Sequence, residues 1–335
     1  MTSTLVLATL HGIPKEFGGD WREAGYLRDP QGARRPVRGD RLYDIEAICV
    51  RLHDAFATVL FGGIDNYYAI LPVVPQFVTI SGLNSEAPLS RELFEQFLER
   101  SKDFPHLNRL LYLYDCRQLV SGVQECTKEA CLLVGEFYRI LNFEDFFVPP
   151  MKEDDGIRYY TSPAVTTMIA VLNMVYVRLH SLLDCLTKLV VEIEKLRSDF
   201  KMYPKLASSG ALFGAHKYHG WNGKNGTLFK RSDTVDEVEL FRNHIIHEGP
   251  LDDMPKAYKA IQGGVAVEKF VLLPNRAGAQ FARYKNRHLF YGAEDRINLR
   301  LPTLLADFQE RQVKTLEAML ARLEEQPHQT LQPGE

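Results

Sequence analysis

The sequence has few cysteines and no pattern that pairs them. Its 335 residues include only Cys49, Cys116, Cys126, Cys131 and Cys185. An odd number without paired spacing does not indicate a disulfide framework, and one C-x4-C pair without a second half is not a zinc motif. We therefore expect reduced cysteines in the core of a cytoplasmic protein.

Export and membrane signals are also missing. The first residues, MTSTLVLATLHGIP, have no basic region and only a short apolar run, so we expect no secretory signal. The most apolar stretch, residues 164–191, is interrupted by Asn173, Arg178, His180 and Asp184. Such polar groups are costly in a bilayer, so this stretch predicts a buried core helix and no membrane association.

Motifs of several enzyme classes are absent. The sequence has no H-E-x-x-H and no G-x-S-x-G, and its glycine-rich run GWNGKNG lacks the GKS or GKT ending of a phosphate-binding loop. These absences argue against a zinc protease, an α/β-hydrolase and an ATPase. His216 and His219 could join His244 and His247 around zinc, but the first two lie in a glycine-rich loop. We therefore predict no metal and no other cofactor.

The chain length and one segment rich in proline and charge suggest two regions. About 150 residues per domain would give two domains, and hydrophobic residues make up an ordinary 45% of the chain. The segment FFVPPMKEDDG, residues 146–156, combines two prolines with a run of charges. We place the divide there. The expected parts are a mixed, mostly helical region over 1–150, of unknown role, and a helical domain over 155–325.

Apolar spacing predicts a mainly α protein. One helix should begin near Asp40 and end at Gly62-Gly63, because its apolar residues recur at helical spacing. Other helices are expected after the cap Ser90, over 107–141, from Ser162-Pro163 to about 200, from 232 or 233 to Gly249, and over 301–323.

Short strands complete the expected fold class. Residues 4–10 and the segment QFVTISG, residues 76–82, have strand composition. The runs VAVEKFVLL and QFARY flank the turn PNRAG, residues 274–278. This pattern predicts a β-hairpin insertion at about 264–291 in the C-terminal helical domain.

Although the net charge is −3, two stretches of the chain contain no acidic residue. Residues 200–232 and 269–293 contain no Asp or Glu. Both also carry aromatic side chains. Their basic residues include the candidate substrate contacts Lys217, Lys224, Lys230, Arg231, Arg283, Lys285 and Arg287. Such groups neutralise phosphates and stack on unpaired bases, which predicts RNA binding. The alternative is a solvated loop and a hairpin with an ordinary polar face.

One helix between these stretches carries the segment Arg242-Asn243-His244-Ile245-Ile246-His247. At about 100° per residue, Asn243 and His247 lie about 100° and 140° from Arg242, so the three share one side. A second R-x4-H, from Arg283 to His288, falls in the predicted hairpin. There, the two side chains would face opposite sides of a strand, which favours the first match.

The segment F-R-N-x-x-x-H-E-G near a helix end resembles the HEPN superfamily. The family is marked by R-x(4–6)-H with a polar residue after the arginine, and the resemblance covers roughly residues 155–325. The predicted hairpin is similar to an insertion in some uncharacterised bacterial members. Residues 1–150 resemble no family that we can name.

The resemblance implies a metal-independent endoribonuclease. In that family the RNA 2′-hydroxyl attacks the neighbouring phosphate, leaving a 2′,3′-cyclic phosphate and a 5′-hydroxyl. By this resemblance, His247 moves protons, Arg242 stabilises the phosphate charge and Asn243 orients His247 or donates to a phosphate oxygen. Two motifs commonly meet across a two-fold axis, which implies a homodimer with a composite active site. A bacterial toxin or anti-phage role, with an antitoxin or regulatory protein as partner, follows by analogy.

Plainer interpretations of the same residues remain open. His247 could cap the helix C-terminus, and Arg242 could pair with Glu239 or Asp236 at little energetic gain. His244 lies off the polar cluster and is either structural or at the substrate's edge. The alternative function is a non-catalytic helical module that binds RNA, nucleotide or a partner protein.

Overall fold

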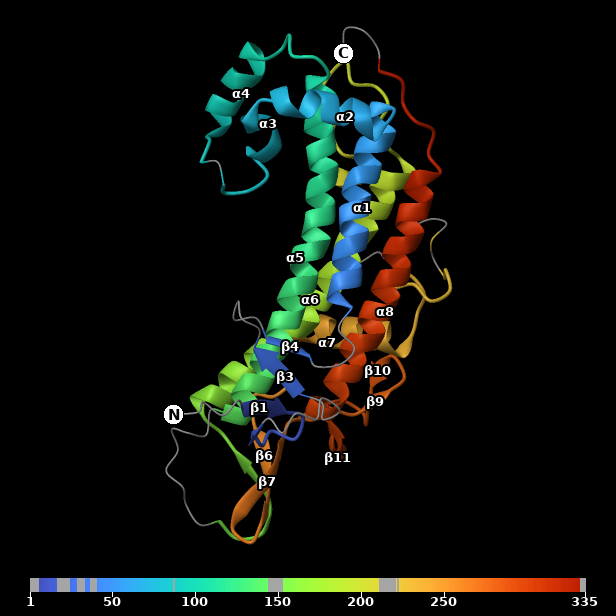
Figure 1. Cartoon of the computed structure of the whole chain (residues 1–335). Coiled ribbons are helices and arrows are strands. Elements are labelled where there is room, and N and C mark those ends of the chain that lie inside the picture. The colour runs from blue at the N-terminus through green and yellow to red at the C-terminus, as the bar shows by residue number, and fades with distance from the viewer. Residues whose placement is uncertain are drawn as a thin grey trace, which may run out of the picture. The chain divides into compact units, whose positions relative to one another are not determined.

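The computed structural model describes residues 6–16, 25–28, 34–36, 41–86, 88–143, 153–210, 221 and 223–331. Eight α-helices lie within these residues, together with short antiparallel sheets (Figure 1). The protein is therefore mainly α, as the sequence predicts.

The chain forms two compact units, and each is built from three separate segments. The first unit comprises Met1–Leu42, Cys126–Ser181 and Arg231–Arg311. The second comprises Tyr43–Glu125, Leu182–Lys230 and Gln312–Glu335. Both units take chain from either side of the boundary expected near residue 150.

The first unit combines helices with all of the described strands. Its helical residues come from the end of α5 (Leu107–Phe143), the start of α6 (Pro163–Glu194), α7 (Asp233–His247) and the start of α8 (Ile297–Glu324). The strands β1 (Val6–Thr9), β2 (Lys15–Glu16), β3 (Gly25–Arg28) and β4 (Arg34–Pro36) form one antiparallel sheet in the order β2-β1-β3-β4. The strands β5 (Gly156–Tyr160), β6 (Ala257–Gln262) and β7 (Val265–Phe270) form a second.

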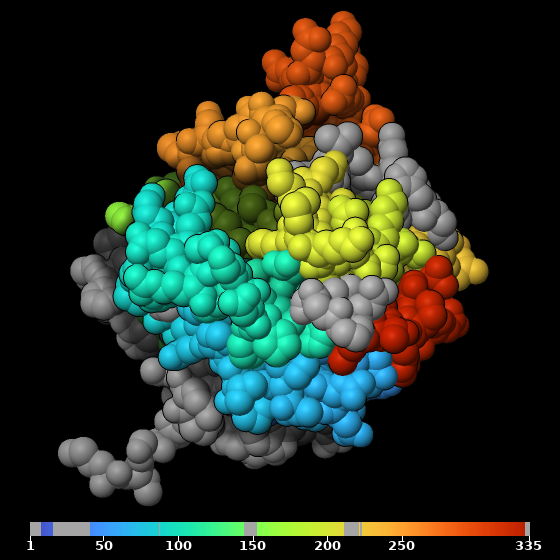
Figure 2. Space-filling model, turned by 90° about the horizontal axis from the view of Figure 1, so that it is seen from above, coloured from blue at the N-terminus to red at the C-terminus, as the bar shows by residue number. Residues whose placement is uncertain are grey.

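The regular elements of the second unit are all helices within its described residues. It contains nearly all of α1 (Leu42–Phe61), then α2 (Ile64–Ile70), the 3-10 turn η1 (Leu71–Val73), α3 (Gln76–Ile80) and α4 (Arg91–Arg100). The start of α5, the end of α6, the 3-10 turn η3 (Ala207–Gly210) and the end of α8 complete it. Figure 2 shows α3 and α4, in cyan, at the surface. None of the ten residues of α4 is buried.

Helices predicted from apolar spacing and caps are confirmed. The eight predicted core positions of α1 are all buried: Leu42, Ile45, Ile48, Cys49, Leu52, Phe56, Val59 and Leu60. The hydroxyls of Ser90, Ser162 and Ser232 each accept a bond from a backbone N–H in the first turn of the following helix. The helix after Ser162 ends at Glu194 rather than near 200, and the last helix begins four residues earlier than predicted.

Two strand predictions need correction. The segment QFVTISG does not form a strand, because Gln76–Ile80 make the short helix α3. Pro75 stands at its N-cap and Val78 is the buried residue, so local context overrides β-propensity. The strand predicted over residues 4–10 is confirmed over Val6–Thr9, as β1.

The strands of the predicted hairpin also pair differently from the prediction. β7 pairs with β6 across the turn Gly263-Gly264, and both glycines have positive φ, which a two-residue hairpin turn of this kind requires. β8 (Leu272–Pro274) pairs with β11 (Tyr291–Arg296). Only β9 (Arg276–Ala277) and β10 (Gln280–Phe281) pair across the predicted turn. The Gly-Gly signal was overlooked in the sequence.

The apolar helix α6 is long and hydrophobic enough to cross a membrane, but half of its most apolar window is buried inside the protein. Its buried side chains include Leu172, Leu179, Leu183 and Leu186. The observation agrees with the predicted core helix.

Candidate functional site

Helix α7 is fixed at both ends by local chemistry. The Ser232 hydroxyl accepts a 3.3 Å bond from the N–H of Val235, and Asp233 in the first turn suits the positive end of the helix dipole. At the other end, the N–H groups of Glu248 and Gly249 both bond to the carbonyl of His244. Gly249 has φ of 120°, so the chain leaves the helix directly after the R-x4-H segment.

Packing decides which face of α7 meets solvent. Val235, Val238 and Phe241 are buried, and the Phe241 ring stacks on Tyr176 of α6 with centroids 4.8 Å apart. Ile245 is half-buried. The opposite face therefore holds the polar residues at the end of the helix.

Arg242, Asn243 and His247 lie together on this polar face. One Arg242 nitrogen, Nη1, donates a 2.9 Å bond to Asn243 Oδ1 and lies 3.4 Å from Nε2 of His247. Arg242 is half-buried, whereas Asn243 and His247 are exposed. The three predicted catalytic residues thus form one accessible cluster, and Arg242 connects the other two.

This arrangement constrains the imidazole. An arginine can only donate, so the contact with Nε2 of His247 is a hydrogen bond when that nitrogen holds a lone pair. In this tautomer, Nε2 is a proton acceptor beside a permanent cation. The guanidinium has five N–H donors, a number that suits both its neighbours and an oxyanion.

The two acids that the sequence offers as partners of Arg242 form ion pairs with a different arginine. Asp236 and Glu239 lie 2.6 Å and 2.9 Å from nitrogens of Arg231. Arg231, predicted to contact substrate, is therefore engaged in two ion pairs on α7. Surface pairing with these acids does not account for the position of Arg242.

Part of the first basic stretch belongs to the second unit. The ammonium of Lys224 lies 4.5 Å from the ring centroid of Trp221, and Lys230 donates a 2.6 Å bond to Asn225. Lys217 lies outside the described residues. The structure therefore places Lys224 and Lys230 in a different unit from α7.

The second basic stretch belongs to the same unit as α7. Arg283, Lys285 and Arg287 are exposed on a turn closed by reciprocal backbone bonds between Tyr284 and Arg287. Lys285 has a φ of 54°, so the strand expected for this segment is wrong: a turn interrupts it. We name residues 283–287 the basic turn.

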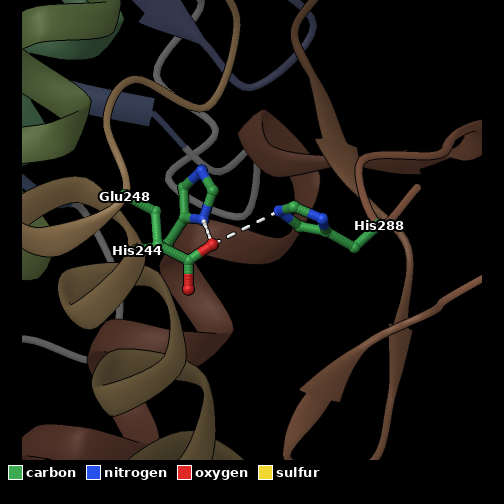
Figure 3. A group of neighbouring side chains, drawn as sticks. All are labelled: His244, Glu248 and His288. Atoms are coloured by element: carbon green, nitrogen blue, oxygen red, sulfur yellow. Dashed lines mark hydrogen bonds and ion pairs between the residues drawn. The ribbon is translucent and has the colours of Figure 1, made fainter. Parts of the chain in front are cut away.

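His288 follows the basic turn and brings it to the end of α7. Its ring lies 5.6 Å from that of His244, and its Nε2 lies 3.3 Å from Oε2 of Glu248. The same oxygen lies 3.1 Å from Nδ1 of His244 (Figure 3). In the sequence, His288 is only the end of the second R-x4-H, and Glu248 is only a member of the HEPN-like segment with no role of its own. The i,i+4 spacing of His244 and Glu248 was the one visible signal.

A buried ionic group underlies the start of α7. Glu237 has no exposed surface, accepts a 3.0 Å bond from the Tyr176 hydroxyl and pairs with Arg276 and Arg300. Burial raises the pKa of Tyr176, while a hydrogen bond from Arg276 lowers that of Asp233. Arg276, Arg300 and Asp233 also line a cavity of about 420 Å³.

Comparison with protein-family models, with curated proteins and with solved structures gives no match. The chemical interpretation of the site therefore depends on the contacts, exposure and charge of its own side chains.

Proposed function

We propose that this protein is an endoribonuclease that cleaves RNA by attack of a 2′-hydroxyl on the adjacent phosphate, as its HEPN-like segment implies. The observation that carries the proposal is the exposed cluster of Arg242, Asn243 and His247, with Arg242 touching both of the others. The basic turn supports it, because three exposed cations next to His288 suit an RNA backbone.

The reaction has two proton transfers. The 2′-oxygen forms a bond to phosphorus as its proton leaves, and the bond from phosphorus to the 5′-oxygen breaks as that oxygen gains a proton. His247, with a lone pair on Nε2, takes the first proton, and the Arg242 guanidinium stabilises the charge on the phosphoryl oxygens. Asn243 positions the guanidinium through its 2.9 Å bond.

In an in-line attack the 2′-oxygen and the leaving 5′-oxygen lie on opposite sides of the phosphorus, so one imidazole is poorly placed to serve both proton transfers. The homodimer implied by the resemblance would bring a second His247 across a two-fold axis to protonate the leaving oxygen. A cytoplasmic toxin or anti-phage effector, restrained by an antitoxin or regulatory protein, is the cellular role that we propose for such an enzyme.

Product chemistry tests this proposal directly. Purified protein is incubated with single-stranded RNA, and with the same oligonucleotide carrying 2′-deoxyribose throughout. We expect products with 2′,3′-cyclic phosphate and 5′-hydroxyl ends from the RNA alone. Arg242→Ala and His247→Ala should abolish cleavage, whereas the exposed His328→Ala should leave it intact.

Other outcomes contradict the proposal. RNA binding without cleavage would favour a non-catalytic module. Cleavage of the deoxy substrate, or products with 5′-phosphate ends, would indicate attack by water rather than by the 2′-hydroxyl. Cleavage retained in both alanine variants would place the active site elsewhere.

A further inference from the structure

We infer that His244, Glu248 and His288 bind one divalent transition-metal ion of the zinc class. Each residue offers one ligand atom, and the three atoms lie within 4.8 Å of one another. Figure 3 shows both imidazoles directed toward the same carboxylate, from α7 on one side and from the segment after the basic turn on the other. The sequence alone predicts no metal, and the zinc set considered there includes neither Glu248 nor His288.

The separations of the ligand atoms suit a metal. Zinc bonds of about 2.0–2.2 Å in tetrahedral geometry place neighbouring ligands about 3.4 Å apart. The carboxylate oxygen lies 3.1 Å from His244 Nδ1 and 3.3 Å from His288 Nε2. The two imidazole nitrogens lie within 4.8 Å of each other, and side-chain rotations that bring them to about 3.4 Å would admit an ion.

Hydrogen bonding alone does not account for this arrangement. His288 Nε2 is a buried atom that makes no hydrogen bond within the described part of the chain, although the Glu248 oxygen lies 3.3 Å away. The His244 side chain is only 5% exposed, and its Nδ1 faces the same oxygen. A cation at the centre would satisfy both nitrogen lone pairs and the carboxylate together.

The ligand types select the ion. Two imidazoles and one carboxylate match zinc and its first-row neighbours, whereas magnesium and calcium prefer sites made of oxygen alone. Three protein ligands leave a fourth position for water.

Metal binding would fasten the basic turn to α7. His288 follows Arg287 directly, and Glu248 follows His247. The ion would thus hold the basic turn against the end of α7 that also carries the Arg242 cluster. This consequence rests on the proposed function, but metal binding itself does not.

Metal titration tests the site without reference to RNA. Untagged protein is treated with a chelator, dialysed and titrated with Zn²⁺ by calorimetry, and with Co²⁺ by absorption spectroscopy. We expect one ion per chain and a tetrahedral Co²⁺ spectrum. Glu248→Gln and His288→Ala should each weaken binding at least tenfold, whereas the neighbouring His247→Ala and the remote His328→Ala should bind as the wild type does.

The two proposals fail separately. His247→Ala should abolish RNA cleavage and retain Zn²⁺, whereas His288→Ala should lose Zn²⁺ and weaken RNA binding without changing the product ends. Thermal unfolding adds a check: Zn²⁺ should raise the midpoint of the wild type but not of His288→Ala. Absence of stoichiometric Zn²⁺ binding, or equal binding by Glu248→Gln, His288→Ala and wild type, would overturn the metal site.

Discussion

The hydroxyl of Tyr176 donates a 3.0 Å hydrogen bond to Glu237 in the interior of the first unit, where neither side chain has exposed surface. Two arginines, Arg276 and Arg300, reach the other oxygen of the same carboxylate. This group joins α6, α7, β9 and α8, so it fixes the start of the helix that carries the candidate site.

Glu237→Ala should therefore be costly. Its removal leaves both arginines with only the exposed Asp233 as an acidic partner among the described residues, so the cost should approach that of a broken buried ion pair, about 3–5 kcal/mol. Tyr176→Phe removes one hydrogen bond to a charged group, at about 1.5–3 kcal/mol. Urea unfolding measures both, with the exposed Glu325→Ala as a control expected within about 0.5 kcal/mol of wild type. A small effect of Glu237→Ala would mean that the group adds little to stability.

The helix caps offer a matched comparison. Ser232 and Ser90 each accept a 3.3 Å bond from a backbone N–H, but α7 contains buried residues and α4 contains none. Ser232→Ala should lower the free energy of unfolding by about 1 kcal/mol. Ser90→Ala should increase hydrogen exchange within α4 and leave global unfolding unchanged. Equal global losses would show that α4 unfolds together with the core.

Asp115 makes stability depend on pH. Burial raises its pKa to about 6 from an ordinary 3.8, although a hydrogen bond from Tyr203 opposes the rise. The folded state therefore holds this proton more tightly than the unfolded chain does. Its contribution is fully present below about pH 4 and is lost as the pH rises through 6.

Asp115→Asn removes this titration. We subtract the unfolding free energy of the variant from that of the wild type. This difference should fall between pH 4 and pH 6 and stay constant above pH 6. Chemical denaturation at a series of pH values gives this difference. A difference that does not change with pH would contradict the raised pKa.

Two glycines separate backbone strain from crowding. Gly12 and Gly278 have similar φ angles, 69° and 64°, but a Cβ at Gly12 would lie 2.7 Å from Lys269 Cβ, whereas none of the described atoms lies within 4 Å of a Cβ at Gly278. Gly278→Ala should cost about 1 kcal/mol from strain alone. Gly12→Ala should cost about 1–3 kcal/mol more, because the neighbouring strand must move. Equal decreases in the unfolding midpoint of the two variants would contradict this difference.

Under the proposed function, Arg242 and Lys285 should affect different kinetic constants. Arg242→Lys keeps the charge but loses the guanidinium fork, so kcat should fall by about 10- to 100-fold. Lys285→Ala should raise KM with kcat unchanged and reduce the salt dependence of RNA binding. Steady-state cleavage across salt concentrations measures both. A loss of kcat in Lys285→Ala would instead assign the basic turn to the chemistry.

Local patterns predicted the helices well and the sheets poorly. The spacing of Leu52, Phe56 and Val59 and the cap Ser232 act within a few residues, so the sequence reveals them. The pairing of β5 with β6 joins residues about a hundred positions apart, and no local pattern specifies it. β5 itself was not predicted.

In the candidate site, too, contacts within one helix could be predicted and contacts between distant segments could not. Arg242, Asn243 and His247 share one helix, so their contact follows from helical geometry. His288 reaches His244 through a turn whose conformation depends on the positive φ of Lys285. Sequence spacing could not place it there.

The interleaved construction of the two units has a practical consequence. α5, α6 and α8 each begin in one unit and end in the other. No single cut of the gene separates the two units, and a cut through one of these helices would leave apolar helix faces in water. Neither unit can therefore be expressed, exchanged between proteins or inherited as an uninterrupted module.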